Sequence, residues 1–174
     1  SCRTFVDAIR GGIPDDNLQV FFLSETLAAY RISIDWLYSN TIGDFWPADD
    51  SGARSVLTPM ANLQDCLRDA DAICSFIHGT FGEDGGLAQI CEQQGRQAYL
   101  GSPPAPLELS FSKSLTHRWL AAQGYPVARQ IAVEADDAIE HIDISALTQN
   151  NKSVVVKPAR GGSSDGVSIV GAHA

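Results

Sequence analysis

The sequence predicts an α/β protein, in which a domain with a parallel sheet is followed by an incomplete α+β unit. Strand-like and helix-like patterns alternate between Leu18 and Leu100, which is typical of a parallel sheet covered by helices. A second strand pattern follows, because Val154 to Val170 holds two β-branched runs around a loop rich in glycine and serine. The 174 residues are 44% hydrophobic, enough to bury a core.

The first part of the chain supplies the elements of the predicted parallel sheet. A helix is expected over residues 4–10, where Phe5, Val6 and Ile9 form one apolar stripe, and Gly11-Gly12 would end it. The expected elements that follow are strands over 18–23 and 30–36, a loop over 46–59, a helix over 60–70, a strand over 72–77, a helix over 86–94 and a short strand over 98–100.

The strand over 30–36 depends on strict alternation. Ile32, Ile34 and Trp36 would face one side of the sheet, and the polar residues between them would face the other.

A run of glycine, serine and proline at 101–104 marks a predicted boundary between a domain over 1–104 and a partial domain over 105–174. Beyond it, residues 107–123 predict one helix or two shorter ones. The second unit would begin at 128–133 and continue with a helix over 139–147 and a strand over 153–157. These elements are too few to cover a sheet on both faces.

Composition excludes some functions. The formal net charge of -9 and the pI of about 4.7 argue against a nucleic-acid partner, which needs a basic face. The four cysteines lack metal-ligand spacing, so no metal site is expected, and Cys74 and Cys91 are predicted to be reduced and buried. Without an apolar run of membrane-spanning length or a secretory signal, the chain is expected to be soluble and cytoplasmic, with no membrane partner.

The loop inside Val154 to Val170 has the composition of a phosphate-binding loop. Glycines let backbone amides approach a ligand, serines add hydroxyl donors, and a lysine at the strand end supplies charge that suits a polyphosphate. These candidate nucleotide-binding residues are Lys157, Gly162, Ser163, Ser164 and Gly166. The alternative is a hairpin with a floppy polar tip.

A second segment, Ser75 to Gly86, predicts an apolar strand that runs into a glycine-rich turn and then a helix. The turn carries His78, which would lie at the carboxyl end of the strand, where open α/β sheets bind ligands. Glu83 and Asp84 precede the helix, where carboxylates cap free amides. We therefore expect both to act as caps, with Glu83 also bracing the site.

Together with Phe111-Ser112-Lys113 and the Val-Lys-Pro-Ala-Arg-Gly-Gly-Ser-Ser run, this segment resembles the D-alanine–D-alanine ligases of the ATP-grasp superfamily between about Ser75 and Val170. The resemblance implies an N-terminal pre-ATP-grasp domain over 1–104 and the start of an ATP-grasp central domain over 105–174. The C-terminal catalytic part has no counterpart here, so the chain alone is expected to be inactive.

The resemblance also implies residue roles. Lys113 and Lys157 would bind the phosphates of ATP, and the glycine loop would close over them. His78 and Ser163 would be the catalytic residues, with His78 near the first D-alanine. The implied partners are small molecules, ATP with Mg²⁺ and D-alanine or another amino acid, and a homodimer. The magnesium ligands would lie outside this chain, and the whole enzyme would supply peptidoglycan precursors to the cell wall.

The sequence also departs from the family. Gly161 replaces a glutamate and Asp165 an apolar residue, which would loosen the loop and place negative charge near the phosphates. Residues 30–59 match no family motif. Two alternatives therefore stay open. One is an ATP-grasp ligase for another amino acid or peptide, and the other is a non-catalytic binding module with exposed Trp36, Trp46 or Tyr38 as anchors. Lys113 by itself could also be a solvated surface lysine.

Overall fold

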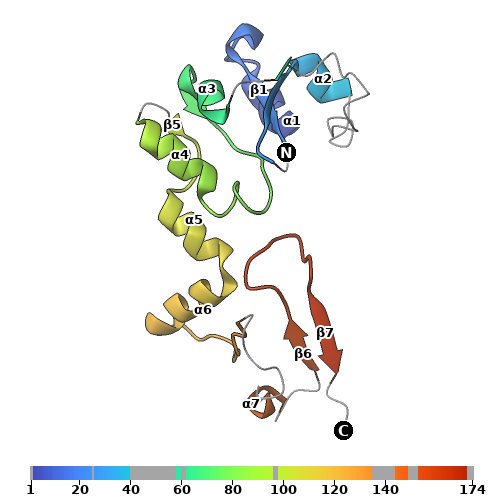
Figure 1. Cartoon of the computed structure of the whole chain (residues 1–174), viewed down its shortest axis with the longest axis vertical. Coiled ribbons are helices and arrows are strands. Elements are labelled where there is room, and N and C mark those ends of the chain that lie inside the picture. Colours follow the sequence, from blue (N-terminus) through green and yellow to red (C-terminus); the bar gives the residue numbers. More distant parts are fainter. Residues whose placement is uncertain are drawn as a thin grey trace. The chain divides into compact units, whose positions relative to one another are not determined.

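The computed structural model describes most of the chain, in seven stretches: residues 2–24, 26–39, 58–59, 62–95, 98–134, 144–148 and 153–171. The chain divides into two compact units (Figure 1). The first unit comprises Ser1–Phe76 and Ile90–Leu100, and the second comprises Ile77–Gln89 and Gly101–Ala174.

The strands of the first unit pair in two ways. β1 (Val20–Leu23) and β2 (Ala29–Ile32) are antiparallel, with Val20 opposite Ile32, and β3 (Thr58–Pro59) pairs with the far side of β2. β4 (Ala72–Ile73) and β5 (Ala98–Tyr99) form a separate parallel pair.

The expectation of one parallel sheet is therefore wrong for β1 and β2. A parallel connection needs a crossover, usually through a helix. Only a short turn joins these two strands, in which the Leu27 amide donates to the Ser24 carbonyl at 2.9 Å. The expected strand over 72–77 is paired only at Ala72–Ile73, and the expected loop over 46–59 ends in β3. The earlier part of that loop lies outside the described residues.

Two helices contribute to the main buried cluster of this unit. α1 (Cys2–Ile9) confirms the first predicted helix, and α2 (Ile34–Ser39) follows β2 directly. Val6, Ile32 and Leu37 form the buried centre of the cluster, and partly buried hydrophobic residues surround it. Those surrounding residues are Cys2, Leu18, Val20, Phe22, Ile34, Trp36 and Tyr38.

The predicted strand over 30–36 is thus wrong beyond Ile32. The Ser33 hydroxyl accepts a hydrogen bond from the Trp36 amide at 3.2 Å, and the Ser33 carbonyl accepts one from the Leu37 amide at 3.2 Å. Serine favours this capping position, so the chain turns into a helix there. Trp36 packs against the core instead of standing out as an anchor, and Trp46 lies outside the described residues.

The helix predicted over 60–70 is α3 (Leu63–Arg68), which starts at an Asn62 cap whose side chain accepts the Asp65 amide. Among the cysteines, Cys66 and Cys91 are buried, while Cys2 and Cys74 are partly exposed and all four are free thiols. The expected burial of Cys74 is therefore only partial, because β4 ends at Ile73. Burial raises the pKa of the Cys66 and Cys91 thiols, which keeps them protonated and unreactive.

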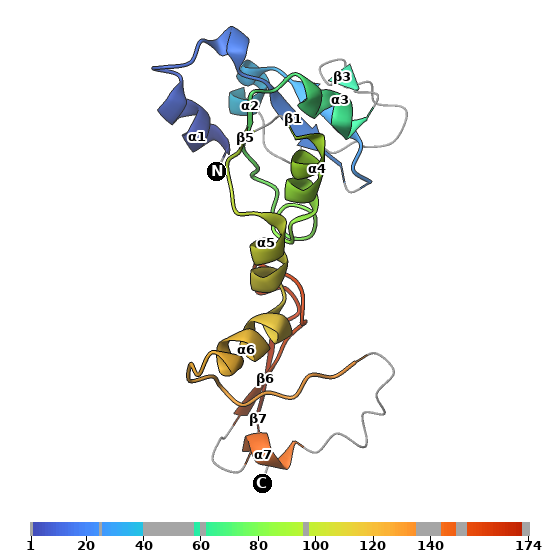
Figure 2. The same cartoon turned by 90° about the vertical axis from the view of Figure 1, so that its left-hand side faces the viewer.

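The second unit contains helices and one hairpin (Figure 2). α5 (Pro104–Phe111) and α6 (Lys113–Ala122) are two separate helices because Ser112 is extended between them and its hydroxyl caps α6. β6 (Ser153–Val156) and β7 (Ser168–Gly171) pair antiparallel, with Val156 opposite Ser168, so the predicted hairpin is confirmed. Of the helix predicted over 139–147, only α7 (Ser145–Thr148) is seen, and residues 139–143 lie outside the described residues.

α4 (Gly86–Gln94) has the bounds that the sequence predicts. Two buried residues, Leu87 and Ala88, lie in its first turn. This helix bears on the predicted site because the turn that carries His78 leads directly into it.

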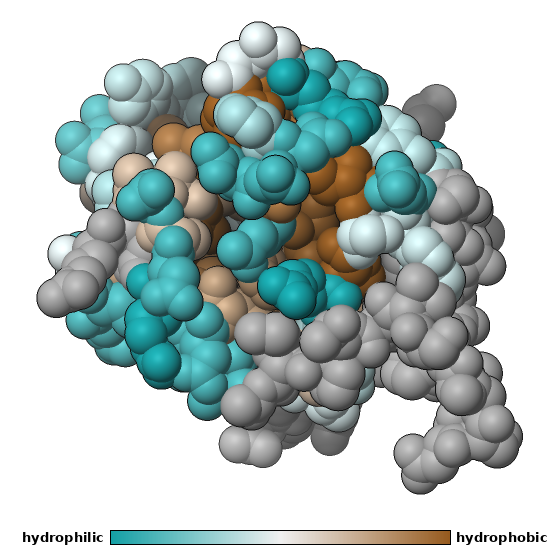
Figure 3. Space-filling model, turned by 90° about the horizontal axis from the view of Figure 1, so that it is seen from above, coloured by the Kyte–Doolittle hydropathy of each residue, from teal (hydrophilic) through white to brown (hydrophobic). Residues whose placement is uncertain are grey.

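The surface of the molecule is only partly polar. Seen from above, brown hydrophobic surface is exposed between teal hydrophilic side chains (Figure 3). Each residue of β1 is only partly buried. None of the helices in the described part of the chain has the length and apolar character needed to cross a membrane.

Candidate functional site

The turn at residues 78–86, which we call the histidine turn, is held by its own carboxylates. The Glu83 side chain accepts the Gly79 amide at 2.7 Å, and its other oxygen lies 3.6 Å from His78 Nδ1. The His78 side chain is 85% exposed. The turn thus presents an imidazole to solvent with the Glu83 carboxylate near it, and the bracing role expected of Glu83 stays a prediction.

Asp84 caps the end of this turn. Its Oδ1 accepts hydrogen bonds from the Phe81 amide at 2.9 Å and from the Gly86 amide, the first of α4, at 3.0 Å. The predicted capping role is confirmed for Asp84. Glu83 differs, because its side chain bonds the Gly79 amide within the turn and not an amide at the start of the helix.

The loop between β6 and β7 has an unusual backbone. Ser163 and Ser164 have φ angles of 52° and 60°, in the left-handed region that residues other than glycine rarely adopt. Gly166, with φ 68°, has no room for a side chain, because a Cβ there would lie 2.7 Å from Pro158 Cγ. Such strain clusters at ligand-binding loops, which favours the binding loop over the floppy hairpin tip.

The base of this loop, Ala159–Gly162, is tied to the start of α6. The Lys113 amide donates to the Ala159 carbonyl at 2.9 Å, and Lys113 Nζ donates to the Gly161 carbonyl at 2.8 Å. Lys113 is partly buried. It is therefore not the solvated surface lysine that its sequence context alone would allow.

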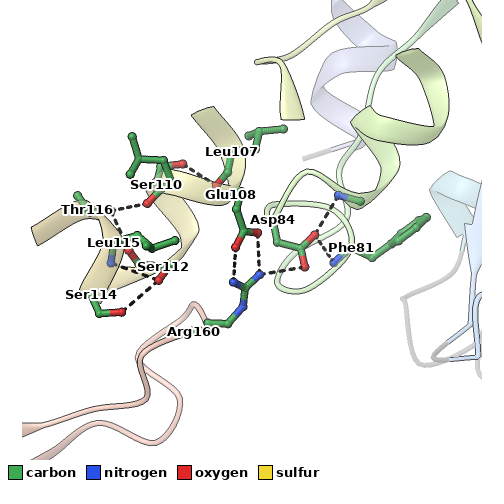
Figure 4. A network of polar contacts seen from close by, with 12 residues as sticks. Phe81, Asp84, Leu107, Glu108, Ser110, Ser112, Ser114, Leu115, Thr116 and Arg160 are labelled. Atoms are coloured by element: carbon green, nitrogen blue, oxygen red, sulfur yellow. Dashed lines mark hydrogen bonds and ion pairs between the residues drawn. The ribbon is translucent and has the colours of Figure 1, made fainter. Parts of the chain in front are cut away.

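Arg160 joins the loop base to α5 and to the histidine turn through several polar contacts (Figure 4). Its guanidinium donates to both oxygens of Glu108 on α5, at 2.6 and 2.9 Å, and lies 3.7 Å from Asp84 Oδ2. It also lies over the Phe111 ring, with Cζ 5.4 Å from the ring centroid. The hydrogen bond from Arg160 lowers the pKa of the Glu108 carboxyl, and the same bond raises the pKa of Arg160.

Sequence reasoning missed both Arg160 and Glu108. The signal for Arg160 was its place inside the matched Val-Lys-Pro-Ala-Arg-Gly-Gly run, and Glu108 is the single charged residue of α5.

The predicted site residues therefore come together only in part. His78, Glu83, Lys113 and Gly162 belong to the second unit, and a Cβ on Gly162 would lie 3.3 Å from Glu83 Oε2. The loop base thus adjoins the histidine turn.

Other predicted residues stand open at the loop tip. Lys157, Ser163, Ser164 and Gly166 are exposed, and within the described stretches the Lys157 ammonium pairs with no other group. Two backbone hydrogen bonds hold the tip itself. The Asp165 amide donates to the Gly162 carbonyl at 3.0 Å, and the Val167 amide donates to the Ser164 carbonyl at 3.3 Å. Hydroxyls, amides and a lysine are thus left available for an anion.

A metal centre is not formed by the described residues, since no three of their histidine, cysteine, aspartate or glutamate side chains gather to hold an ion.

A glycine-rich turn with an exposed histidine adjoins a hairpin whose glycine and serine loop is preceded by lysine, and these are the features expected of a site for an anionic ligand such as a polyphosphate. Solved structures share this fold. The D-alanine–D-alanine ligase from Coxiella burnetii superposes with a TM-score of 0.69 over 97% of this chain and 51% of its own, at 23% identity. The VanG D-Ala:D-Ser ligase from Enterococcus faecalis superposes with a TM-score of 0.71 over 98% and 51%, at 18% identity.

Sequence relatives indicate the family to which the chain belongs. The D-alanine–D-alanine ligase of Mycolicibacterium smegmatis is 35% identical over 106 residues, which are 61% of this chain and 28% of that protein. That of Mycolicibacterium vanbaalenii is 32% identical over 147 residues, 84% of this chain and 39% of that protein. The chain belongs to the D-alanine–D-alanine ligase family, of whose curated members it spans well under half the length. No family model matches it.

Proposed function

We propose that this chain is the part of an ADP-forming ligase that binds the nucleotide phosphates and the first substrate. The ligase would join two D-alanines through an acyl phosphate, for peptidoglycan precursor synthesis. The observation that carries the proposal is the contact between the loop base and the histidine turn within one unit, where Gly162 approaches Glu83. The phosphate donor and the acceptor would meet at that place.

In this function Lys113 and Lys157 neutralise the phosphates of ATP. The Lys113 ammonium donates one of its three hydrogen atoms to the Gly161 carbonyl, so two remain for hydrogen bonds to phosphate oxygens. The Lys157 ammonium donates no hydrogen bond to the described residues. The amides of Gly162 and Gly166 and the hydroxyls of Ser163 and Ser164 would enclose the phosphates from above, because fixed donors stabilise the charge that develops in phosphoryl transfer.

His78 would serve the first amino acid. Its imidazole is exposed and lies 3.6 Å from Glu83, so it can offer a hydrogen bond to a substrate. The substrate carboxylate attacks the γ-phosphorus, the bond to the bridging oxygen breaks and ADP leaves. The amine of the second D-alanine then attacks the acyl phosphate, loses a proton and expels inorganic phosphate.

Magnesium is implied by the family, and it would add positive charge at the phosphates. The described residues do not offer a ligand set for it, so we propose that it is held outside them and route no step through it. The domain division at 104/105 and a cytoplasmic location are further proposals from the sequence, and a homodimer is a proposal that rests on the family likeness alone.

The proposal is tested in the full-length gene product by steady-state kinetics. Lys157→Ala should lower turnover by about 100-fold to 1000-fold, the usual cost of losing a charge-stabilising group. Ser163→Ala should cost less. His78→Ala should raise the KM for the first D-alanine and leave the KM for ATP nearly unchanged.

Arg118→Ala is the matched control, because Arg118 is an exposed cation on α6. If Lys157→Ala and Arg118→Ala both keep a turnover close to that of the wild type, the assignment of Lys157 is contradicted.

A further inference from the structure

Arg160 touches all three segments of the site. It belongs to the loop base, it donates to Glu108 of α5 through its two terminal guanidinium nitrogens, and it faces Asp84 of the histidine turn. Two parallel bonds fix the plane of a guanidinium as well as its position. The Phe111 ring packs against one face of this guanidinium and so limits its movement further. Arg160 thus connects the loop base to α5 and to the histidine turn.

Asp84 uses its two carboxylate oxygens for different tasks. Oδ1 accepts the amides of Phe81 and Gly86 and so fixes the backbone of the histidine turn. Oδ2 faces the Arg160 guanidinium at 3.7 Å. The Asp84 side chain is only 13% exposed, whereas that of Arg160 is 47% exposed, so the pair lies at the edge of the solvent.

We propose that Arg160 is a positioning residue that couples the glycine loop to the histidine turn through Asp84. When a polyphosphate orders the loop, Arg160 is held against Asp84, and the capped turn then holds His78 in place for the first amino acid. The inference rests on the proposed function, because it assumes that the loop and the turn bind the two substrates of one reaction. Coupling of this kind raises the affinity of one ligand when the other is bound, and the effect is reciprocal.

The substitution Asp84→Asn isolates the coupling from the cap. An asparagine retains an oxygen that can accept the Phe81 and Gly86 amides, so the turn keeps its backbone bonds. It loses the negative charge that faces Arg160 and places an amide nitrogen there instead. Arg160→Gln removes the other partner, and Arg118→Gln, an exposed arginine outside the network, is the control for loss of one positive charge.

Amide hydrogen exchange on the full-length gene product, with and without a non-hydrolysable ATP analogue, measures the coupling. In the wild type and in Arg118→Gln, the analogue should slow exchange both in the loop, 159–166, and in the histidine turn, 79–86. In Asp84→Asn and Arg160→Gln it should slow exchange in the loop only. If the analogue protects the histidine turn in Arg160→Gln as strongly as in the wild type, the proposal is overturned.

Kinetics supplies a readout that a merely structural role would not change. At saturating ATP, Asp84→Asn should raise the KM for the first amino acid by about tenfold, within the range of typical coupling factors, while the KM for ATP changes little. Arg160→Lys should recover part of the wild-type KM, because it keeps the charge but loses the paired bonds to Glu108. A KM for the amino acid that is equal in Asp84→Asn and wild type would also overturn the proposal.

Exchange in the nucleotide-free protein separates this inference from the proposed function. If the analogue protects nothing but Arg160→Gln still speeds exchange of the Phe81 and Gly86 amides, the link between loop and turn stands and the nucleotide assignment fails. If Arg160→Gln leaves these amides at the wild-type exchange rate without nucleotide, the link itself is wrong.

Discussion

Gly82 illustrates how closely the histidine turn is packed at the level of single residues. A Cβ at this buried position would lie 2.2 Å from the Ile77 carbonyl oxygen and 2.5 Å from Ile77 Cβ. Neither atom belongs to a flexible side-chain end, so the backbone itself would have to move. The shape of the turn that presents His78 therefore depends on the absence of a side chain at Gly82.

Gly82→Ala should lower the free energy of unfolding by about 1 to 3 kcal/mol, the usual cost of overpacking. Thermal and denaturant unfolding measure this change. Gly12→Ala is the control, because a Cβ there meets only the Ile9 carbonyl oxygen, at 3.9 Å. Equal stability of the two variants would show that the turn does not have the conformation described.

Protonation of Glu108 should release the loop base. The pKa of Glu108 is lowered by its hydrogen bond from Arg160, so the pair stabilises the folded form above the ordinary glutamate pKa of about 4.3. This contribution is lost as the pH falls through the lowered value. Amide exchange of Ala159–Gly162, corrected for intrinsic rates, should therefore rise below about pH 4.

Glu108→Gln is the matched variant for this pH dependence. It should show fast exchange at every pH, because its amide cannot form the charged pair at all. A wild-type pH profile that matches the profile of Glu108→Gln would contradict the role given to the pair.

At the scale of elements, the hairpin of β6 and β7 combines an anchored base with an open tip. Lys113 and Arg160 tie down Ala159–Gly162, while the tip from Ser163 to Gly166 is exposed and has few backbone bonds. Loops that close over ligands come from such weakly held segments.

Limited proteolysis without nucleotide should cut the tip before it cuts α5, α6 or the two strands, and an ATP analogue should slow that cleavage. The cut sites are identified by mass spectrometry. Early cleavage within β6 or β7, with the tip intact, would argue against the tip as a mobile lid.

Local sequence patterns predicted the elements whose signals agree with one another. α4 begins after a glycine pair and an aspartate cap and keeps an apolar stripe, so its bounds could be predicted. The hairpin was marked by two β-branched runs on either side of turn residues. The segment after Ile32 was not predictable in the same way, because the Ser33 cap competes with an alternating pattern that fits a strand equally well.

The site was predicted in outline only. The lysines, the loop and His78 stand in short motifs that can be recognised in the sequence. The pair of Arg160 and Glu108 joins residues 52 positions apart, and no local periodicity indicates such a contact. Its discovery required the fold, because long-range pairing is set by how the elements pack.

At the scale of the whole molecule, the two units divide the elements unequally. The first unit contains most of the buried hydrophobic residues, including the cluster around Val6, Ile32 and Leu37. The second contains the residues that we assign to binding, and its hairpin exposes Val155, Ile169 and Val170. Since the chain spans about half the length of the solved structures that it matches, activity has to be measured on the full-length gene product.

Release of inorganic phosphate, measured with D-alanine beside a panel of other D- and L-amino acids, tests the central claim most directly. The account predicts ATP-dependent release that requires D-alanine, is lost in Lys157→Ala and is retained in Arg118→Ala. Release that ignores D-alanine but responds to another amino acid would contradict the proposed substrate. Absence of any release that depends on an amino acid would contradict the proposed ligase itself.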